Sequence, residues 1–250
     1  MEDAREEYQF RSYILEQLEK WEKQKETADD QKIRPISVVT ISSLPGSGGQ
    51  MVAKAIAERM GYDLFDREII NRISKSADIS STVIDTLEKE RLTGIEDFIA
   101  SILNKRYIWP GVYLDHLTRV IGVIGKHGRA VIVGRGANFI LPPKERVAIR
   151  IVAPLEMRVE RISDAFKVPY SAARKRVLNR ESKRKAFVTK AYNADITDPL
   201  HYEMVLNMAN LTVEDALEAV TVVLNKKRTL AEAAAAGKAV RQGPTASRIA

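Results

Sequence analysis

A glycine-rich segment after the first apolar run has the residue types and spacing of an anion-binding loop. Residues 43–50 read Ser-Leu-Pro-Gly-Ser-Gly-Gly-Gln, in register with the phosphate-binding pattern G-x-x-x-x-G-K-[ST]. In that pattern backbone N–H groups surround the phosphates, the lysine neutralises their oxygens, and the hydroxyl ligates Mg²⁺. In this chain Ser43 replaces the first glycine, Gly49 replaces the lysine, and Gln50 replaces the hydroxyl residue.

The remaining loop can still bind phosphate through its backbone. Glycine permits positive φ angles and the close approach of a ligand, and the start of the following helix favours negative charge. We therefore predict that phosphate is bound by the loop residues Gly46, Ser47, Gly48, Gly49 and Gln50. A plain glycine turn between a strand and a helix would have the same local sequence.

Charged residues directly follow two other predicted strands. Asp66 and Arg67 come at the end of residues 62–66, and Arg135 lies between two glycines after an apolar run. A charged side chain above an apolar strand has to face a cleft or find a partner. The planar guanidinium group also matches phosphate oxygens. For Asp66 and Arg67, the alternative is a surface pair that caps the next helix.

The densest basic run of the chain lies between residues 174 and 185. On a helix, Arg176, Arg180 and Arg184 share one face because they are four residues apart. A solvated basic helix would have the same pattern. Asp195 and Asp198 are the nearest acids. They could hold Mg²⁺ through water or orient the arginines of the basic run, and an exposed turn before Pro199 accounts for them equally well.

These residues need a scaffold, and the hydrophobic pattern predicts one. Strands are expected within residues 36–42, 62–66, 129–141, 146–154 and 202–209, with helices between them. Residues 67–128 read mainly as helices. The alternation predicts an α/β fold with three layers, a five-stranded parallel sheet flanked by helices. Ligands in such folds bind at the carboxyl ends of the strands, where the glycine loop, Arg67 and Arg135 converge.

Composition excludes several other kinds of site. The chain of 250 residues has no cysteine, which excludes disulfides, thiolate catalysis and cysteine-ligated metal, and its three histidines lack the spacing of a zinc site. The net charge is +7, most of it contributed after residue 226, so the rest of the chain does not predict a nucleic-acid-binding protein.

Three regions are expected along the chain. Residues 1–34 form an N-terminal helical extension and linker, residues 35–225 form the α/β domain, and residues 226–250 form a basic, alanine-rich and flexible tail. The first twenty residues are charged throughout, and no apolar run is long enough to span a membrane. A cytoplasmic protein is therefore expected.

Four segments in chain order resemble the cytidylate kinase-like family, relatives of the P-loop nucleoside-monophosphate kinases. They are VVTISSLPGSGGQMVAKAIAERMGYDLFDREII, AVIVGRGANFIL, IVAPLEMRVERI and DPLHYEMVLNMANLTVEDA, and together they cover roughly residues 35–225. The chain departs from the family's Gly-Arg-Asp turn, because Gly136 stands where the aspartate is expected.

The resemblance implies a P-loop NTPase fold with a helical insertion and a lid. It also implies phosphoryl transfer from ATP to a nucleoside monophosphate, CMP or dCMP, with Mg²⁺ held by ligands that the sequence does not identify. Asp66, Arg67 and Arg135 would bind the acceptor. Arg180 and Arg184, on the lid, would act in catalysis and supply the charge that Gly49 lacks.

Two other functions are compatible with the sequence. Gly49, Gln50 and the absence of an acidic residue after the strand at 130–133 would suit a nucleotide-binding protein that has lost the transfer step. A polyanion-binding protein could use the basic run and the tail, but these segments lack the interleaved aromatic residues that stack on bases. The oligomeric state and the role of the N-terminal helix are left open.

Overall fold

The computed structural model describes residues 12–17, 19–20, 37–75 and 112–241. Its centre is a sheet in which neighbouring strands are parallel and follow the order β2-β3-β1-β4-β5. The strands are β1 (Val38–Ser43), β2 (Asp63–Phe65), β3 (Ala130–Val133), β4 (Arg146–Val152) and β5 (Met204–Asn207). The predicted five-stranded parallel sheet is therefore confirmed.

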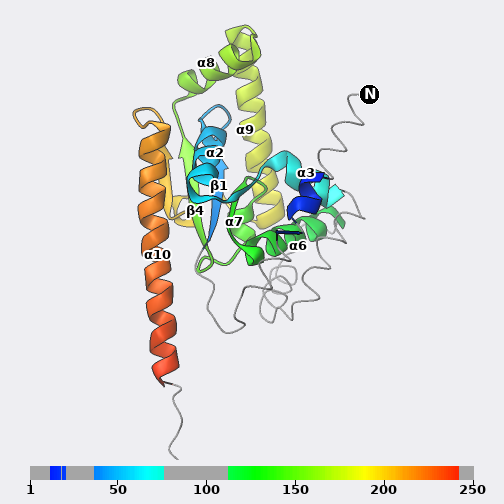
Figure 1. Cartoon of the computed structure of the whole chain (residues 1–250). Coiled ribbons are helices and arrows are strands. Elements are labelled where there is room, and N and C mark those ends of the chain that lie inside the picture. Colours follow the sequence, from blue (N-terminus) through cyan, green and yellow to red (C-terminus); the bar gives the residue numbers. More distant parts are fainter. Residues whose placement is uncertain (1–11, 18, 21–36, 76–111, 242–250) are drawn as a thin grey trace, which may run out of the picture.

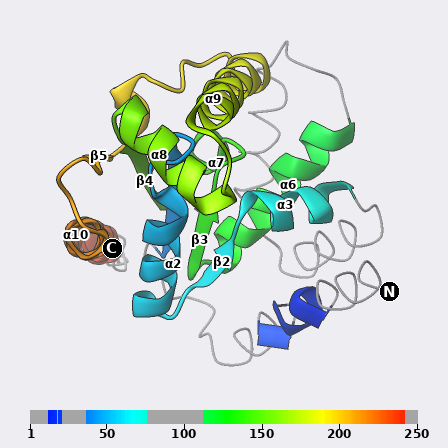
Figure 2. The same cartoon turned by 90° about the horizontal axis from the view of Figure 1, so that it is seen from above.

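Helices cover both faces of the sheet and form the two outer layers of the predicted fold (Figures 1 and 2). One face packs against α2 (Gly49–Met60) and α10 (Val213–Arg241). The other packs against α6 (Val112–His127), α7 (Ala137–Ile140) and α9 (Tyr170–Tyr192), with α3 (Arg67–Lys75) beside α6. The remaining helix, α8 (Leu155–Phe166), packs against the first half of α9. Further helices predicted between residues 76 and 111 lie outside the described residues.

The strands are apolar on both sides because both faces are buried. In β1, Val39 and Ile41 pack with α2 and α10, whereas Val38 contributes to the core on the α6 and α9 side. The two clusters meet only through the sheet, so each strand is fixed in register by side chains on both faces. This rigid sheet places the ends of β1 and β3 side by side.

The chain between β3 and α7 has an unusual backbone. The strand predicted within residues 129–141 ends at Val133, and the last residues of that range form α7. Between them, Gly134, Arg135 and Gly136 all have positive φ angles, of 81°, 53° and 68°. Three successive left-handed residues cannot continue a strand, so the chain turns sharply at Arg135.

The described N-terminal residues pack against the edge strand β2. Ile14 is buried in the core on the α6 side, and the Tyr13 hydroxyl donates to the Leu64 carbonyl oxygen at 3.2 Å. Gln17 and Lys20 each donate to Asp63 Oδ1 at 3.2 Å. This segment therefore covers an edge of the sheet that would otherwise be open.

At the other end of the chain, α10 continues without a break past residue 226 to Arg241, and residues 242–250 lie outside the described part. In Figure 1 the last part of α10 extends beyond the rest of the molecule. Lys227 fastens the helix to the body by donating to the carbonyl oxygens of Pro143 and Arg146 and to Glu203. Among the helices of the described residues, none is both long and apolar enough to cross a membrane.

Candidate functional site

The glycine loop presents its backbone N–H groups at the start of α2. Gly46 and Gly48 have φ angles of 80° and 89°, and a Cβ atom at Gly46 would lie 2.5 Å from the Arg158 carbonyl oxygen. The amides of Gly48, Gly49 and Gln50 make no hydrogen bond within the described part of the chain, and no side chain caps the helix. Free N–H groups and the helix dipole together suit an anion.

Two departures from the usual loop pattern are sterically linked. A Cβ atom at Gly49 would lie 2.4 Å from Ser43 Cβ and 2.7 Å from Ser43 Oγ. Real Cβ atoms do not come so close, so position 49 has no room for a side chain while serine occupies position 43. Ser43 and Gly49 are therefore sterically compatible with each other, whereas Ser43 and a lysine at position 49 are not.

Ser47 braces the loop from within. Only 1% of its surface is exposed, and its hydroxyl lies 2.8 Å from the Leu44 carbonyl oxygen and 3.1 Å from that of Ile151. Its amide also donates to Leu44. In this structure Ser47 holds the loop in shape, whereas Gln50 is exposed and lines the adjacent cleft.

The glycine loop borders an open cavity of about 860 Å³, which we call the loop cleft. Its other walls are residues 66–68 at the start of α3 and residues of α8 that include Arg161 and Asp164. This volume lies in the range of roughly 300–1,000 Å³ that is common for sites that bind small molecules.

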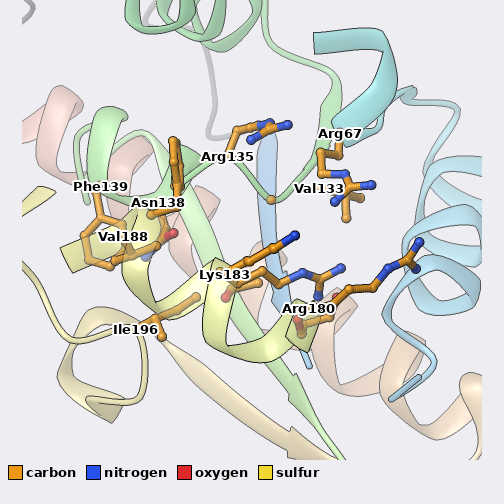
Figure 3. Close-up of a pocket in the computed structure, with 15 residues that line it drawn as sticks. Arg67, Val133, Arg135, Asn138, Phe139, Arg180, Lys183, Val188 and Ile196 are labelled. Carbon is orange, nitrogen blue, oxygen red and sulfur yellow. Dashed lines mark hydrogen bonds between the residues drawn. The ribbon is translucent and has the colours of Figure 1, made fainter. Parts of the chain in front are cut away.

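A smaller cavity of about 180 Å³, which we call the arginine pocket, adjoins the loop cleft. Figure 3 shows several of its side chains, with the basic groups turned toward the space between β3 and α9. The basic residues are Arg67, Arg135, Arg180, Lys183 and Arg184. Apolar side chains, including Phe139 and Ile196, line the other end, so the pocket offers charge at one end and an apolar surface at the other.

Ser43, Arg67, Val133 and Arg184 line both cavities and mark the joint between them. Arg184 is fixed there because its Nη1 donates to the Ser43 carbonyl oxygen. Burial and then the neighbouring guanidinium groups, Arg67 first, together lower the pKa of Arg184 to about 10. Such a concentration of positive charge suits an anionic ligand.

Arg135 is held in a strained backbone conformation above the pocket. It has a positive φ, its buried Nε has no hydrogen-bond partner in the described structure, and its guanidinium lies 5.5 Å from the centre of the Phe187 ring. Burial lowers the pKa of Arg135, and Tyr113 partly opposes this effect. Strain and unpaired donors at one residue are typical of a functional site.

The position of Tyr192 accounts for Gly136, the residue at which the chain departs from the Gly-Arg-Asp turn. Its hydroxyl donates to the Arg135 carbonyl oxygen at 2.7 Å, and its ring stacks on Phe139 with 5.3 Å between centres. A Cβ atom at Gly136 would lie 2.0 Å from the Tyr192 ring. An aspartate cannot stand at position 136 while Tyr192 holds the turn from that side.

Other predicted residues lie at or near the site but have local partners. Asp66 Oδ1 accepts from the amides of Glu68 and Ile69, at 2.8 and 2.9 Å, and so caps α3. Arg176 stacks on Phe166 at 3.9 Å instead of lining either cavity. Asp195 and Asp198 cap their own turns, by accepting from Thr197 and Leu200.

Arg158 is an important residue that the sequence reasoning missed. This buried arginine of α8 forms an ion pair with Glu181 of α9 at 2.9 Å and donates to the Ala153 carbonyl oxygen at 2.9 Å. It also lies 3.5 Å from the Pro45 carbonyl oxygen, so one side chain connects the glycine loop with α8 and α9. The pairing joins residues far apart in the sequence, and only the structure reveals it.

The sequence reasoning also missed Ser42 and Arg150, although the charge of Arg150 was visible in the sequence. Arg150 interrupts the apolar run of β4, and a charge inside a buried strand needs a reason. Its Nη1 donates to Ser42 Oγ at 2.7 Å, and Ser42 lines the arginine pocket.

No group of three or more histidine, aspartate or glutamate side chains suitable for a metal ion occurs among the described residues. Asp66, Glu68 and Asp164 line the loop cleft, but Asp66 is engaged in capping α3. Gln50 stands where the hydroxyl ligand of the usual loop would be. The described side chains therefore do not form a Mg²⁺ site made of protein ligands alone, whereas Glu68 and Asp164 are acids in the loop cleft that an ion bound with phosphates could contact.

Comparison with known proteins agrees with this geometry. The model of the cytidylate kinase-like family matches residues 38–210. A cytidylate kinase from Methanocaldococcus jannaschii is 28% identical over 192 residues, covering 75% of this chain and 97% of that protein. A cytidylate kinase from Methanococcus aeolicus is 25% identical over 196 residues, covering 76% and 99%.

Among solved structures, an uncharacterized protein from Eubacterium ventriosum has the same fold, with a TM-score of 0.61 and 18% identity over 76% of this chain and 99% of that one. The fold, the glycine loop and the match to the family model over most of the sequence lead to one conclusion. The chain belongs to the cytidylate kinase-like family.

Proposed function

We propose that the protein transfers the γ-phosphoryl group of ATP to a nucleoside monophosphate, with CMP or dCMP as the acceptor. The observation that carries the proposal is the joint between the loop cleft and the arginine pocket, which Ser43, Arg67, Val133 and Arg184 share. Membership of the family and the names of its cytidylate kinase relatives support the choice of acceptor.

In this proposal ATP occupies the loop cleft, and the free amides of Gly48, Gly49 and Gln50 hold its phosphates. The phosphate of the acceptor occupies the arginine pocket. One of its oxygens forms a bond to the γ-phosphorus while the bond from that phosphorus to the β,γ-bridging oxygen breaks. ADP and a nucleoside diphosphate result. Mg²⁺ enters as part of the nucleotide substrate.

Arg184 takes the role of the missing lysine in this proposal. It lies at the joint, and its hydrogen bond to the Ser43 carbonyl oxygen fixes it at the first residue of the loop. With a pKa of about 10 it remains charged at neutral pH. Phosphoryl transfer depends on positioning and on stabilising charge rather than on a covalent intermediate, so a guanidinium group can replace an ammonium group here.

The proposal is tested by measuring ADP release from ATP with CMP, dCMP, UMP, AMP and GMP in turn. CMP or dCMP is expected to give the highest kcat/KM. Arg184→Gln should lower kcat by roughly 10²–10³-fold, the usual effect of removing one donor to a developing charge. Arg176→Gln, a matched change on the same helix outside both cavities, should leave kcat unchanged. No ADP release above background with any of the five acceptors would refute the proposal.

A nucleotide-binding protein without transfer activity is the second candidate. It is favoured by Gly49, which has no room for a lysine beside Ser43, and by Gln50, which replaces the hydroxyl that ligates Mg²⁺. Calorimetric titration separates the two. Binding of both ATP and CMP without CMP-dependent ADP release would favour this second function.

A further inference from the structure

Arg150 differs from the other buried arginines of the described chain in its partners. Arg146 and Arg158 each form an ion pair with a glutamate, at 3.1 and 2.9 Å. Arg150 is only 4% exposed, yet it has no carboxylate within 4 Å among the described residues. Its guanidinium donates to Ser42 Oγ at 2.7 Å and lies 5.7 Å from the centre of the Tyr202 ring. A buried charge with only neutral partners is costly, and such groups are commonly retained for function.

Ser42 connects this charge to the arginine pocket. It stands near the end of β1, is 9% exposed, and lines the pocket. Because its oxygen accepts a hydrogen bond from Arg150, its own proton is left for another partner. The Tyr202 hydroxyl is 3.4 Å away, beyond normal O–H···O range, and donates to the Ile196 carbonyl oxygen at 2.9 Å. The Ser42 proton is therefore available to a ligand in the pocket.

The charge of Arg150 also reaches the pocket directly. It is one of the groups that lower the pKa of Arg184. Hydrogen bonds from Thr197 are the main cause of the lowered pKa of the exposed Asp195, and Arg150 is the smallest contributor to it. The positive charge beneath the pocket is thus left without a buried counter-charge in the described structure, and an anion in the pocket would supply one.

We propose that the Ser42 hydroxyl donates a hydrogen bond to the anionic group of the acceptor, and that Arg150 is the positioning residue that orients and polarises this hydroxyl. The inference rests on the proposed function only for the presence of an anionic acceptor in the arginine pocket. A guanidinium donor makes the hydroxyl a stronger donor in turn, because hydrogen bonds in a chain polarise one another.

Calorimetry with inorganic phosphate tests the assignment while β,γ-imido-ATP saturates the loop cleft. Ser42→Ala should weaken phosphate binding about tenfold, as expected for a lost hydrogen bond to a charged group. Arg150→Met should weaken it to a similar extent, and the double variant should bind no more weakly than either single variant, because Arg150 acts through Ser42. Arg150→Lys keeps the charge and should recover part of the affinity. The affinity for β,γ-imido-ATP should stay unchanged.

The control is Ser37→Ala, the same change at the other end of the β1 segment, where the hydroxyl accepts from the Arg129 amide. It should not alter phosphate affinity. The melting temperature of ligand-free Arg150→Met separates positioning from a structural role. Removal of an unpaired buried charge should leave it unchanged or higher, whereas a structural role would lower it.

Each result decides a different point. Unchanged phosphate affinity in Ser42→Ala overturns the assignment and leaves the proposed function to the ADP assay. Additive losses in the double variant overturn the role of Arg150. Phosphate binding that depends on Ser42, without turnover of any monophosphate, supports the assignment of Ser42 but refutes the proposed function. A wild-type protein that binds no phosphate overturns the assignment outright.

Discussion

The guanidinium groups around Arg184 lie close enough to repel one another in the ligand-free protein. Burial and then Arg67, Arg180, Arg150 and Arg135 lower its pKa, all in the same direction. Natural binding sites often reduce stability in this way, because groups arranged for a ligand are not arranged for the empty fold. An anion at the joint would relieve the repulsion and stabilise the protein.

We predict that Arg184→Gln raises the melting temperature of the ligand-free protein, by roughly 2–4 °C for each kcal/mol of repulsion removed. Loss of the hydrogen bond to the Ser43 carbonyl oxygen offsets part of this gain. Thermal unfolding with and without ATP measures both effects. ATP should stabilise the wild type much more than the variant. A variant that melts below the wild type without ligand would contradict the argument.

The pKa of Arg184 also determines how the stabilisation by ATP depends on pH. Arg184 holds its proton below about pH 10. The extra stability that ATP gives should therefore stay constant between pH 7 and 9, as far as Arg184 determines it, and should fall as the pH rises through 10. Thermal unfolding with ATP across this range, with Arg184→Gln as the control, checks the direction.

Lysine cannot be restored at position 49 by a single substitution. Gly49→Lys would drive its Cβ into Ser43, and overpacking of this kind typically costs about 1–3 kcal/mol. Ser43→Gly together with Gly49→Lys removes the clash. We predict that the double variant melts several degrees above the Gly49→Lys variant, as thermal unfolding would measure. Equal melting temperatures would mean that the two positions are not coupled.

At the level of elements, α9 links both cavities. Arg184 lines the joint, Arg180 lines the arginine pocket, Phe187 lies under the Arg135 guanidinium, and Tyr192 holds the turn that carries Arg135. One helix therefore sets the position of Arg180 and Arg184 relative to the turn that carries Arg135. A displacement of one end of α9 would therefore also move the residues at its other end.

Tyr192→Phe tests this coupling. The change keeps the ring that stacks on Phe139 but removes the hydrogen bond to the Arg135 carbonyl oxygen. The loss of about 0.5–1.5 kcal/mol should raise KM for the acceptor about 2- to 10-fold and leave KM for ATP unchanged. Steady-state kinetics with each substrate varied in turn measures both. An equal rise in the two KM values would indicate a general loss of packing instead.

The sequence predicts individual elements better than the contacts between them. The β-branched run at 36–42 and the glycines after it sufficed to predict β1 and the loop, because local sequence determines both. The basic face of residues 176–184 was also visible, but Arg176 turned to Phe166 while Arg184 turned to Ser43. The pairs Arg150–Ser42 and Arg158–Glu181 join separate elements, so their chemistry appears only once the fold brings them together.

Across the whole molecule, segments from both ends of the chain stabilise the sheet. Ile14 and Tyr13 cover β2 at one edge. Near the opposite edge, Lys227 of α10 binds carbonyl oxygens beside β4 and Glu203 before β5. The α/β domain therefore depends on contacts that reach past residue 225, and the lysine at 227 has a structural role.

Two truncated proteins separate the contribution of residues 226–232 to stability from that of the later residues of α10. A chain that ends after Asn225 loses the three hydrogen bonds that Lys227 donates and the one from Arg228 to the Tyr62 hydroxyl. The cost is about 2–4 kcal/mol for bonds to a charged group, and the chain should melt several degrees lower. A chain that ends after Glu232 keeps Lys227 and should melt like the full-length protein. Thermal unfolding of the two truncated proteins provides the comparison. A similar loss in both would place the stabilising contacts beyond residue 232.

The shared wall between the two cavities has a consequence for inhibitor design. Ser43 and Arg184 belong to the walls of both the loop cleft and the arginine pocket, so we predict that one polyphosphate chain can reach from one cavity into the other past these residues. A compound that tethers two nucleosides through such a chain would bind its second half intramolecularly, at an effective concentration in the millimolar range for a short linker. Under the proposed function, such a compound would compete with both substrates at once.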